Sequence, residues 1–124
     1  MKERGSAAVE LALVLPLVLL AALALLQVGL LGRDVLIVTQ AAREGARTAA
    51  VTTDEAVIRD AVARLGLDPS RTEIGVDRAG SVGDPVSVAV RYRAPVIVPF
   101  VGWMFSRQVT LEARFTMRQE TADV

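Results

Sequence analysis

The feature that most constrains this chain is an uncharged apolar stretch near its N-terminus. It extends from Leu11 to Leu31 and is interrupted only by Pro16, Gln27 and Gly29. At about 1.5 Å per residue, a helix of this length covers roughly 30 Å, which is the thickness of the hydrocarbon core of a bilayer. The stretch therefore predicts a transmembrane helix at about residues 11–31, in contact with the lipid bilayer.

A removable secretory signal is the alternative explanation. Such signals have apolar cores of about 7–15 residues followed by a small-x-small cleavage site. The stretch here is longer, its far end at residues 27–33 is a poor cleavage site of that kind, and the helical pattern continues beyond it. A membrane helix is the stronger interpretation. Because Lys2 and Arg4 precede it and positive residues favour the cytoplasmic side, we expect a cytoplasmic N-terminus and an extracytoplasmic domain.

The composition argues against nucleic-acid binding and against catalysis. The 14 basic residues balance the 14 acidic ones, so the basic face of a nucleic-acid-binding protein is not visible. Cys and His are both absent, which removes the usual zinc ligands and the commonest general base. The sequence contains no phosphate-binding loop and no nucleophile or metal-ligand motif. We expect a protein that is not an enzyme and holds no metal or cofactor.

A single carboxylate lies at the start of the apolar stretch. Glu10 follows Gly5 by five positions, with Ser6 and other small residues between them. A carboxylate at the membrane centre costs on the order of 2–3.5 kcal/mol, so it needs a partner or a route to water. In one interpretation, Glu10 reaches the headgroups and is balanced by Lys2 or Arg4. In the other, a protease cuts after Gly5, and the new amine of Ser6 pairs with Glu10 of a neighbouring chain.

Two separated motifs resemble those of a known family. Residues 3–16, ERGSAAVELALVLP, resemble the prepilin-type processing site and look specifically like the start of TadE-like proteins. These are minor pseudopilins of the tight-adherence (Flp pilus) secretion system. Residues 39–47, TQAAREGAR, are similar to a second signature of the same family.

The resemblance implies a pilin-like fold and a role in pilus assembly. Gly5 would end a leader peptide at residues 1–5, Ser6 would be the mature N-terminus, and Glu10 would be the assembly carboxylate. The chain would be the substrate of a separate prepilin peptidase and a partner of other pilins, pseudopilins and inner-membrane pilus machinery. It would reside in the bacterial cytoplasmic membrane, with the pilus or cell surface as a later destination.

A second hypothesis belongs to a different class. The chain would then be a single-pass, membrane-anchored accessory or binding domain outside the cytoplasm that is never processed. The two hypotheses differ in whether residues 1–5 remain on the mature protein.

The helical pattern continues past the membrane span, so we expect one long helix over residues 6–52. In its second half, Ala41, Gly45 and Ala49 fall on one face at four-residue spacing. Small residues allow another element to approach closely. Because Gly costs about 1 kcal/mol relative to Ala inside a helix, we interpret this stripe as a helix-packing surface.

The remaining residues predict a small extracytoplasmic α+β domain at residues 53–118, followed by a flexible polar tail at 119–124. Thr52 and Glu55 have the spacing of a capping box, which predicts a short amphipathic helix over residues 54–65.

Beyond this helix the hydrophobic period changes from 3.6 to 2. Alternation indicates a weak strand at residues 73–77 and two stronger strands at 86–92 and 109–117. A three-stranded antiparallel sheet covered by the helices is the economical architecture.

The connection before the last strand is unusually apolar. Residues 94–105 contain Phe100, Trp103 and Phe105. They form either a hydrophobic plug over the sheet or an exposed interaction patch for the outer headgroups or another pilus subunit. The sequence leaves both alternatives open.

Overall fold

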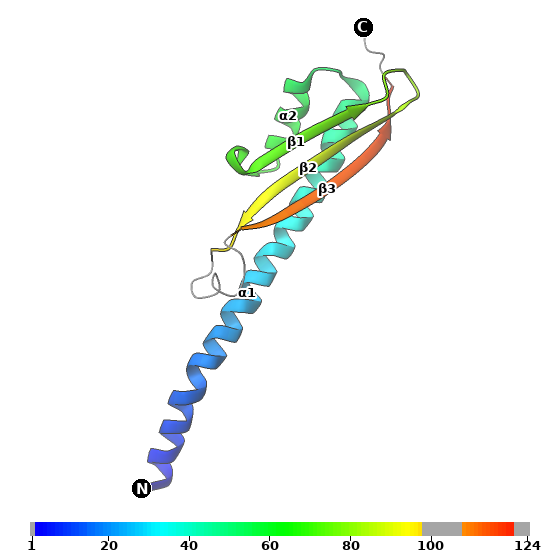
Figure 1. The fold of residues 1–124 in the computed structure, drawn as a ribbon. Helices are drawn as coiled ribbons and strands as arrows, with labels where there is room; N and C mark the ends of the chain where they lie inside the picture. Colours follow the sequence, from blue (N-terminus) through cyan, green and yellow to red (C-terminus); the bar gives the residue numbers. More distant parts are fainter. Residues whose placement is uncertain (1, 98–107, 121–124) are drawn as a thin grey trace.

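The computed structural model describes residues 2–97 and 108–120 of the 124-residue chain. In chain order its elements are α1 (Lys2–Val51), α2 (Glu55–Ala63), the 3-10 turn η1 (Pro69–Arg71), β1 (Thr72–Arg78), β2 (Pro85–Pro95) and β3 (Gln108–Arg118). The strands form one antiparallel sheet in the order β1-β2-β3. The predicted α+β fold, with a long N-terminal helix, a short second helix and a three-stranded antiparallel sheet, is confirmed (Figure 1).

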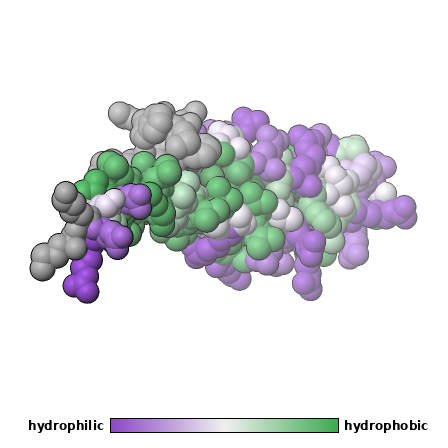
Figure 2. Space-filling model, turned by 90° about the horizontal axis from the view of Figure 1, so that it is seen from below, coloured by the Kyte–Doolittle hydropathy of each residue, from purple (hydrophilic) through white to green (hydrophobic). Residues whose placement is uncertain are grey.

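Helix α1 is continuous through Pro16 and extends far beyond the domain (Figure 1). Its 50 residues correspond to a length of roughly 75 Å. The most apolar 18-residue window has a mean hydropathy of 2.7, and none of it is buried. Figure 2 shows these hydrophobic residues at one end of the molecule, next to a more hydrophilic domain. By length and composition, α1 can therefore cross a membrane.

The core lies where the C-terminal half of α1 packs against one face of the sheet (Figure 1). The helix contributes mostly alanines, and the central strand β2 contributes valines. Because the alanines are short, the helix can approach the sheet closely. The buried apolar residues are Val38, Ala41, Ala42, Ala46, Ala49, Ala50, Ile58, Val62, Leu67, Val86, Val88, Val90, Tyr92 and Ala94.

The N-terminus of α2 differs from the sequence-based prediction. Its N-cap is Asp54, whose Oδ1 accepts a hydrogen bond from the Ala56 amide at 2.9 Å. Thr52 still belongs to the end of α1, since its amide donates to the Thr48 carbonyl at 3.0 Å. The predicted capping box was therefore wrong, and α2 is shorter than predicted at both ends.

Two side chains hold the turn η1: Asp68, which precedes it, and Arg93 from strand β2. Asp68 Oδ1 accepts hydrogen bonds from the Ser70 amide at 3.0 Å and the Ser70 hydroxyl at 2.7 Å. These bonds lower the pKa of the Asp68 carboxyl below its ordinary value. The Arg93 guanidinium donates to the Ser70 carbonyl at 3.0 Å, which ties the turn to β2.

The three predicted strands are confirmed, and each extends beyond its predicted ends. In the centre of the sheet, Val90 pairs with Ile74 on one side and Ala113 on the other. The chain remains attached to the domain after β3. The Gln119 amide donates to the Asp84 carbonyl at 2.8 Å, and the Glu120 amide donates to the Ala50 carbonyl at 2.8 Å. These two residues, assigned to the tail from the sequence, are thus hydrogen-bonded to the domain.

Candidate processing and assembly site

Gly5 and Ser6 lie in the first turns of α1, and both are exposed. A Cβ added to Gly5 would meet no heavy atom within 4 Å. A glycine inside a helix costs about 1 kcal/mol relative to alanine, and no close packing within the described part of the chain requires one here. The glycine is open to recognition by another molecule.

Glu10 is also exposed, one helical turn beyond Ser6. Residues four apart lie on the same helix face, so Ser6 and Glu10 are neighbours separated by about 6 Å along the axis. Among the side chains that the structure describes, which include Arg4 but not Lys2, Glu10 forms no ion pair. Its carboxylate is therefore exposed on the same helix face as Ser6.

The small-residue stripe lies in the interior of the domain. Ala41 and Ala49 are fully buried, and Gly45 is buried between them. A Cβ on Gly45 would lie 2.9 Å from Val88 Cγ1 and 3.1 Å from Val62 Cγ2. The stripe is therefore covered by β2 and α2 of the same chain.

The second family-like motif, residues 39–47, also contacts the sheet. Its Arg43 is exposed on α1 and places its guanidinium 5.4 Å from the centre of the Phe115 ring on β3. A cation over an aromatic face at this distance is attracted by the ring. The motif thus combines buried small residues with an exposed cation that stabilises the edge of the sheet.

Arg78 is a structural residue that sequence analysis missed. From the end of β1, its Nη1 donates to the Ala49 carbonyl at 2.8 Å and its Nη2 to the Thr52 carbonyl. The last turn of α1 contains no basic residue of its own, so Arg78 supplies the positive charge favoured at a helix C-terminus. No local pattern signals this contact, because Arg78 and Ala49 are 29 residues apart.

Gln27 is the exception in the apolar half of α1. It is 1 % exposed, whereas nearby Leu25 and Leu26 are well exposed. Burial keeps a polar side chain away from lipid, where an amide would be costly. From the sequence, Gln27 was noted only as an interruption of the apolar stretch, and its burial was not predicted.

Two predictions concern other parts of the chain. The apolar patch of Phe100, Trp103 and Phe105 lies outside the described residues. Within residues 2–97 and 108–120, no group of three or more acidic residues could hold a metal ion.

The structure defines a class of protein: a small α+β domain carried on a long N-terminal helix that can span a membrane. Residues 5–47 match the model of the TadE-like protein family, which confirms the resemblance over both motifs. The matched residues are confined to helix α1. Neither the curated proteins nor the solved structures include a match to the chain.

Proposed function

We propose that this chain is a minor pseudopilin of a tight-adherence, type IV-like pilus or secretion system. A prepilin peptidase removes residues 1–5, and the mature chain is needed for pilus assembly. The chain is a substrate in this process and has no catalytic activity of its own. The observation that carries the proposal is Gly5, an exposed helical glycine inside the segment that matches the TadE-like family. No heavy atom of the described residues lies within 4 Å of a Cβ added to it.

Removal of the leader changes the charge at the start of α1. Cleavage after Gly5 gives Ser6 a free amine, which is positively charged near neutral pH. The exposed carboxylate of Glu10 lies one turn away on the same face. When helices stack where water is scarce, the amine of one chain and Glu10 of another satisfy each other. Register between neighbouring helices then follows from this pair.

The proposal includes a location and partners. The positive charges of Lys2 and Arg4 favour a cytoplasmic N-terminus, with the span in the cytoplasmic membrane and the domain on the other side. Partners are the peptidase, other pilins or pseudopilins, and the inner-membrane pilus machinery.

The test is the intact mass and N-terminal sequence of the full chain extracted from membranes with and without a co-expressed prepilin peptidase. We expect a mature chain that begins at Ser6 only when the peptidase is present. Gly5→Leu should block cleavage. The matched control is Gly29→Leu, because Gly29 is another helical glycine with no heavy atom within 4 Å of an added Cβ.

Two results would overturn the proposal. Retention of residues 1–5 in the presence of an active peptidase would favour the unprocessed membrane-anchored accessory domain. Equal cleavage of wild type and Gly5→Leu would show that the protease recognises another feature.

A further inference from the structure

Both outer strands of the sheet have free edges. β1 and β3 each pair with β2, and no other described strand lies beyond either of them. A free edge presents a row of N–H and C=O groups that can pair with another strand. The two strands run in the same direction, because each is antiparallel to β2. A neighbouring copy shifted sideways without rotation would therefore place its β1 parallel to β3 of the first copy.

The long helix selects between the ways in which two copies can join. A sideways shift keeps both α1 helices pointing the same way, as two chains inserted in one membrane require. Antiparallel pairing of β3 with β3, about a twofold axis perpendicular to the strands, would instead reverse one α1, because the helix lies along the sheet (Figure 1). Copies in one membrane can use the first arrangement and not the second.

The outer face of the sheet carries complementary charges at its two edges. β1 presents Glu73 and Asp77, while β3 presents Arg114 and Arg118, and all four are exposed. Both pairs have four-residue spacing, so the distance between the charges along each strand is the same, roughly 13 Å. None of the four takes part in an ion pair within the described part of the chain.

The remaining charges on this face are already satisfied. Glu112 on β3 pairs with Arg91 on β2, with 3.1 Å between Nη2 and Oε2. The edges are thus left with two unpaired carboxylates on one side and two unpaired guanidinium groups on the other. Opposite charges that face each other across paired strands are stabilising.

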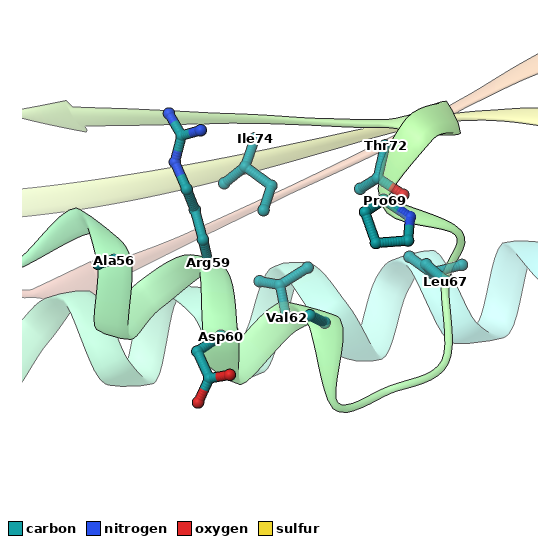
Figure 3. A pocket seen from close by; sticks show the side chains of 9 residues that line it. Ala56, Arg59, Asp60, Val62, Leu67, Pro69, Thr72 and Ile74 are labelled. Carbon is teal, nitrogen blue, oxygen red and sulfur yellow. The ribbon is translucent and has the colours of Figure 1, made fainter.

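The inner face beside β1 offers an apolar groove. It has a volume of about 460 Å³ and lies between α2 and β1 (Figure 3). Its apolar walls include Val62, Leu67, Pro69 and Ile74. Figure 3 shows Ile74 and Val62 extending into the space between the two elements. An edge strand docked on β1 would place alternate side chains toward this groove.

One register of β3 against β1 pairs the opposite charges on the outer face and also brings apolar side chains together on the inner face. When Arg114 lies opposite Glu73, Arg118 lies opposite Asp77 on the outer face. On the inner face, Phe115 then lies beside Ile74. Phe115 is only half-buried in the single chain, so its ring has surface left to bury in the groove of a neighbour.

We propose that copies of this chain associate side by side, with β3 of one copy docked on β1 of the next in this register. The contact is heterologous, so each copy retains one free edge and a row can continue. The docking does not depend on removal of residues 1–5, and it can therefore be tested in the Gly5→Leu chain without a peptidase.

Disulfide trapping in membranes tests the contact, because the natural chain has no cysteine. In the proposed register, Gly75 lies opposite Thr116, and adjacent strands are about 4.8 Å apart, within reach of a disulfide. A Cβ at Gly75 meets nothing within 4 Å, so Gly75→Cys should be tolerated. On mild oxidation, the full-length chain with both Gly75→Cys and Thr116→Cys should give a ladder of dimers, trimers and higher species.

The controls separate this contact from random collision. Gly75→Cys with Thr110→Cys places the second cysteine roughly 20 Å along the strand and should give no ladder. Each single variant should stay monomeric. When two tagged forms that carry one cysteine each are co-expressed, only the Gly75→Cys and Thr116→Cys chains should cross-link to each other. Equal trapping in the Thr110→Cys control, or cross-linking between two Thr116→Cys chains, would overturn the proposal.

Charge reversal gives an independent test of the register. Asp77→Arg or Arg118→Asp alone should reduce trapping at least several-fold, because like charges would then face each other. The two changes together should restore it. Trapping that is insensitive to the single reversals would contradict the proposed register, and so would failure of the double reversal to restore it.

Discussion

Gly45 faces Val88 so closely that a Cβ on the glycine would lie 2.9 Å from Val88 Cγ1. Real Cβ atoms are essentially never this close to another heavy atom, and Val88 is β-branched and fully buried. We expect Gly45→Ala to lower the free energy of unfolding by about 1–3 kcal/mol, since overpacking outweighs the gain in helix propensity. Thermal unfolding of the full chain in detergent measures the change.

The matched control is Gly32→Ala, a helical glycine whose added Cβ meets nothing within 4 Å. It should be neutral or slightly stabilising. Combining Gly45→Ala with Val88→Ala should cost less than the sum of the two single changes, because the second removes the atom that the first meets. Additive costs would contradict the proposed contact.

Arg78 connects the end of β1 to the end of α1 through the Ala49 and Thr52 carbonyls. Arg78→Ala should lower the free energy of unfolding by about 2 kcal/mol, because two carbonyls lose a charged donor. Arg78→Lys should recover only part of this, since lysine cannot present the planar fork that reaches both oxygens. Arg64→Ala is a suitable control, because Arg64 makes an exposed pair with Asp60 and should change stability by less than about 1 kcal/mol.

Tyr92 should make stability depend on alkaline pH. Burial raises the pKa of its phenol above 10.0, and the Asp34 carboxylate adds to the effect. Because the unfolded phenol ionises near pH 10, it releases its proton before the folded one does. This contribution to stability is therefore complete below about pH 10 and is lost as the pH rises through the folded pKa.

The chain offers a direct measurement, since Tyr92 is its only tyrosine. Absorbance titration at alkaline pH should give a single phenol with a pKa above its ordinary value. Tyr92→Phe should remove the tyrosine-dependent part of the decline in melting temperature with pH. An ordinary phenol pKa in the folded chain would refute the prediction.

Glu10→Ala should separate processing from assembly. We expect the leader to be removed as in wild type, because the cleaved bond is five residues away. Loss of one partner of a pair in a dry environment costs about 3–5 kcal/mol, so recovery of the chain with other pilus subunits should fall at least about tenfold. Glu3→Ala removes a carboxylate from the leader and should leave assembly intact. Normal recovery of Glu10→Ala would argue against an assembly role.

Membrane orientation can be tested with a cysteine at exposed Thr53, just beyond α1. A membrane-impermeant maleimide should label Thr53→Cys in intact spheroplasts. Ser6→Cys, at the other end of the span, should react only after the membrane is opened. The reverse pattern would place the domain in the cytoplasm.

The periodic parts of the fold were predictable from the sequence. The apolar run predicted the long helix, and strict alternation predicted β2 and β3, because a strand with one buried face must alternate. The N-cap of α2 was misplaced because Thr52 and Asp54 are both good caps. Two hydrogen bonds of the folded chain decide between them: the Thr52 amide donates to the Thr48 carbonyl, and Asp54 Oδ1 accepts from the Ala56 amide.

Features that depend on distant segments were not predictable. The pairing of Arg78 with Ala49 and the groove between α2 and β1 both require the complete fold. The candidate site likewise combines features that the sequence predicted with features that only the structure showed. Spacing alone singled out Gly5 and Glu10, whereas their exposure came from the structure, as did the free space between Gly5 and the other described residues.

A single uninterrupted helix has a mechanical consequence. The residues of α1 that could lie in the bilayer contribute almost nothing to the core of the domain, yet they continue without a break into the segment that does. The helix can therefore be drawn out of the lipid along its axis while the domain stays folded. A change in the tilt or rotation of the span, by contrast, would turn the whole sheet with it, because there is no hinge between them.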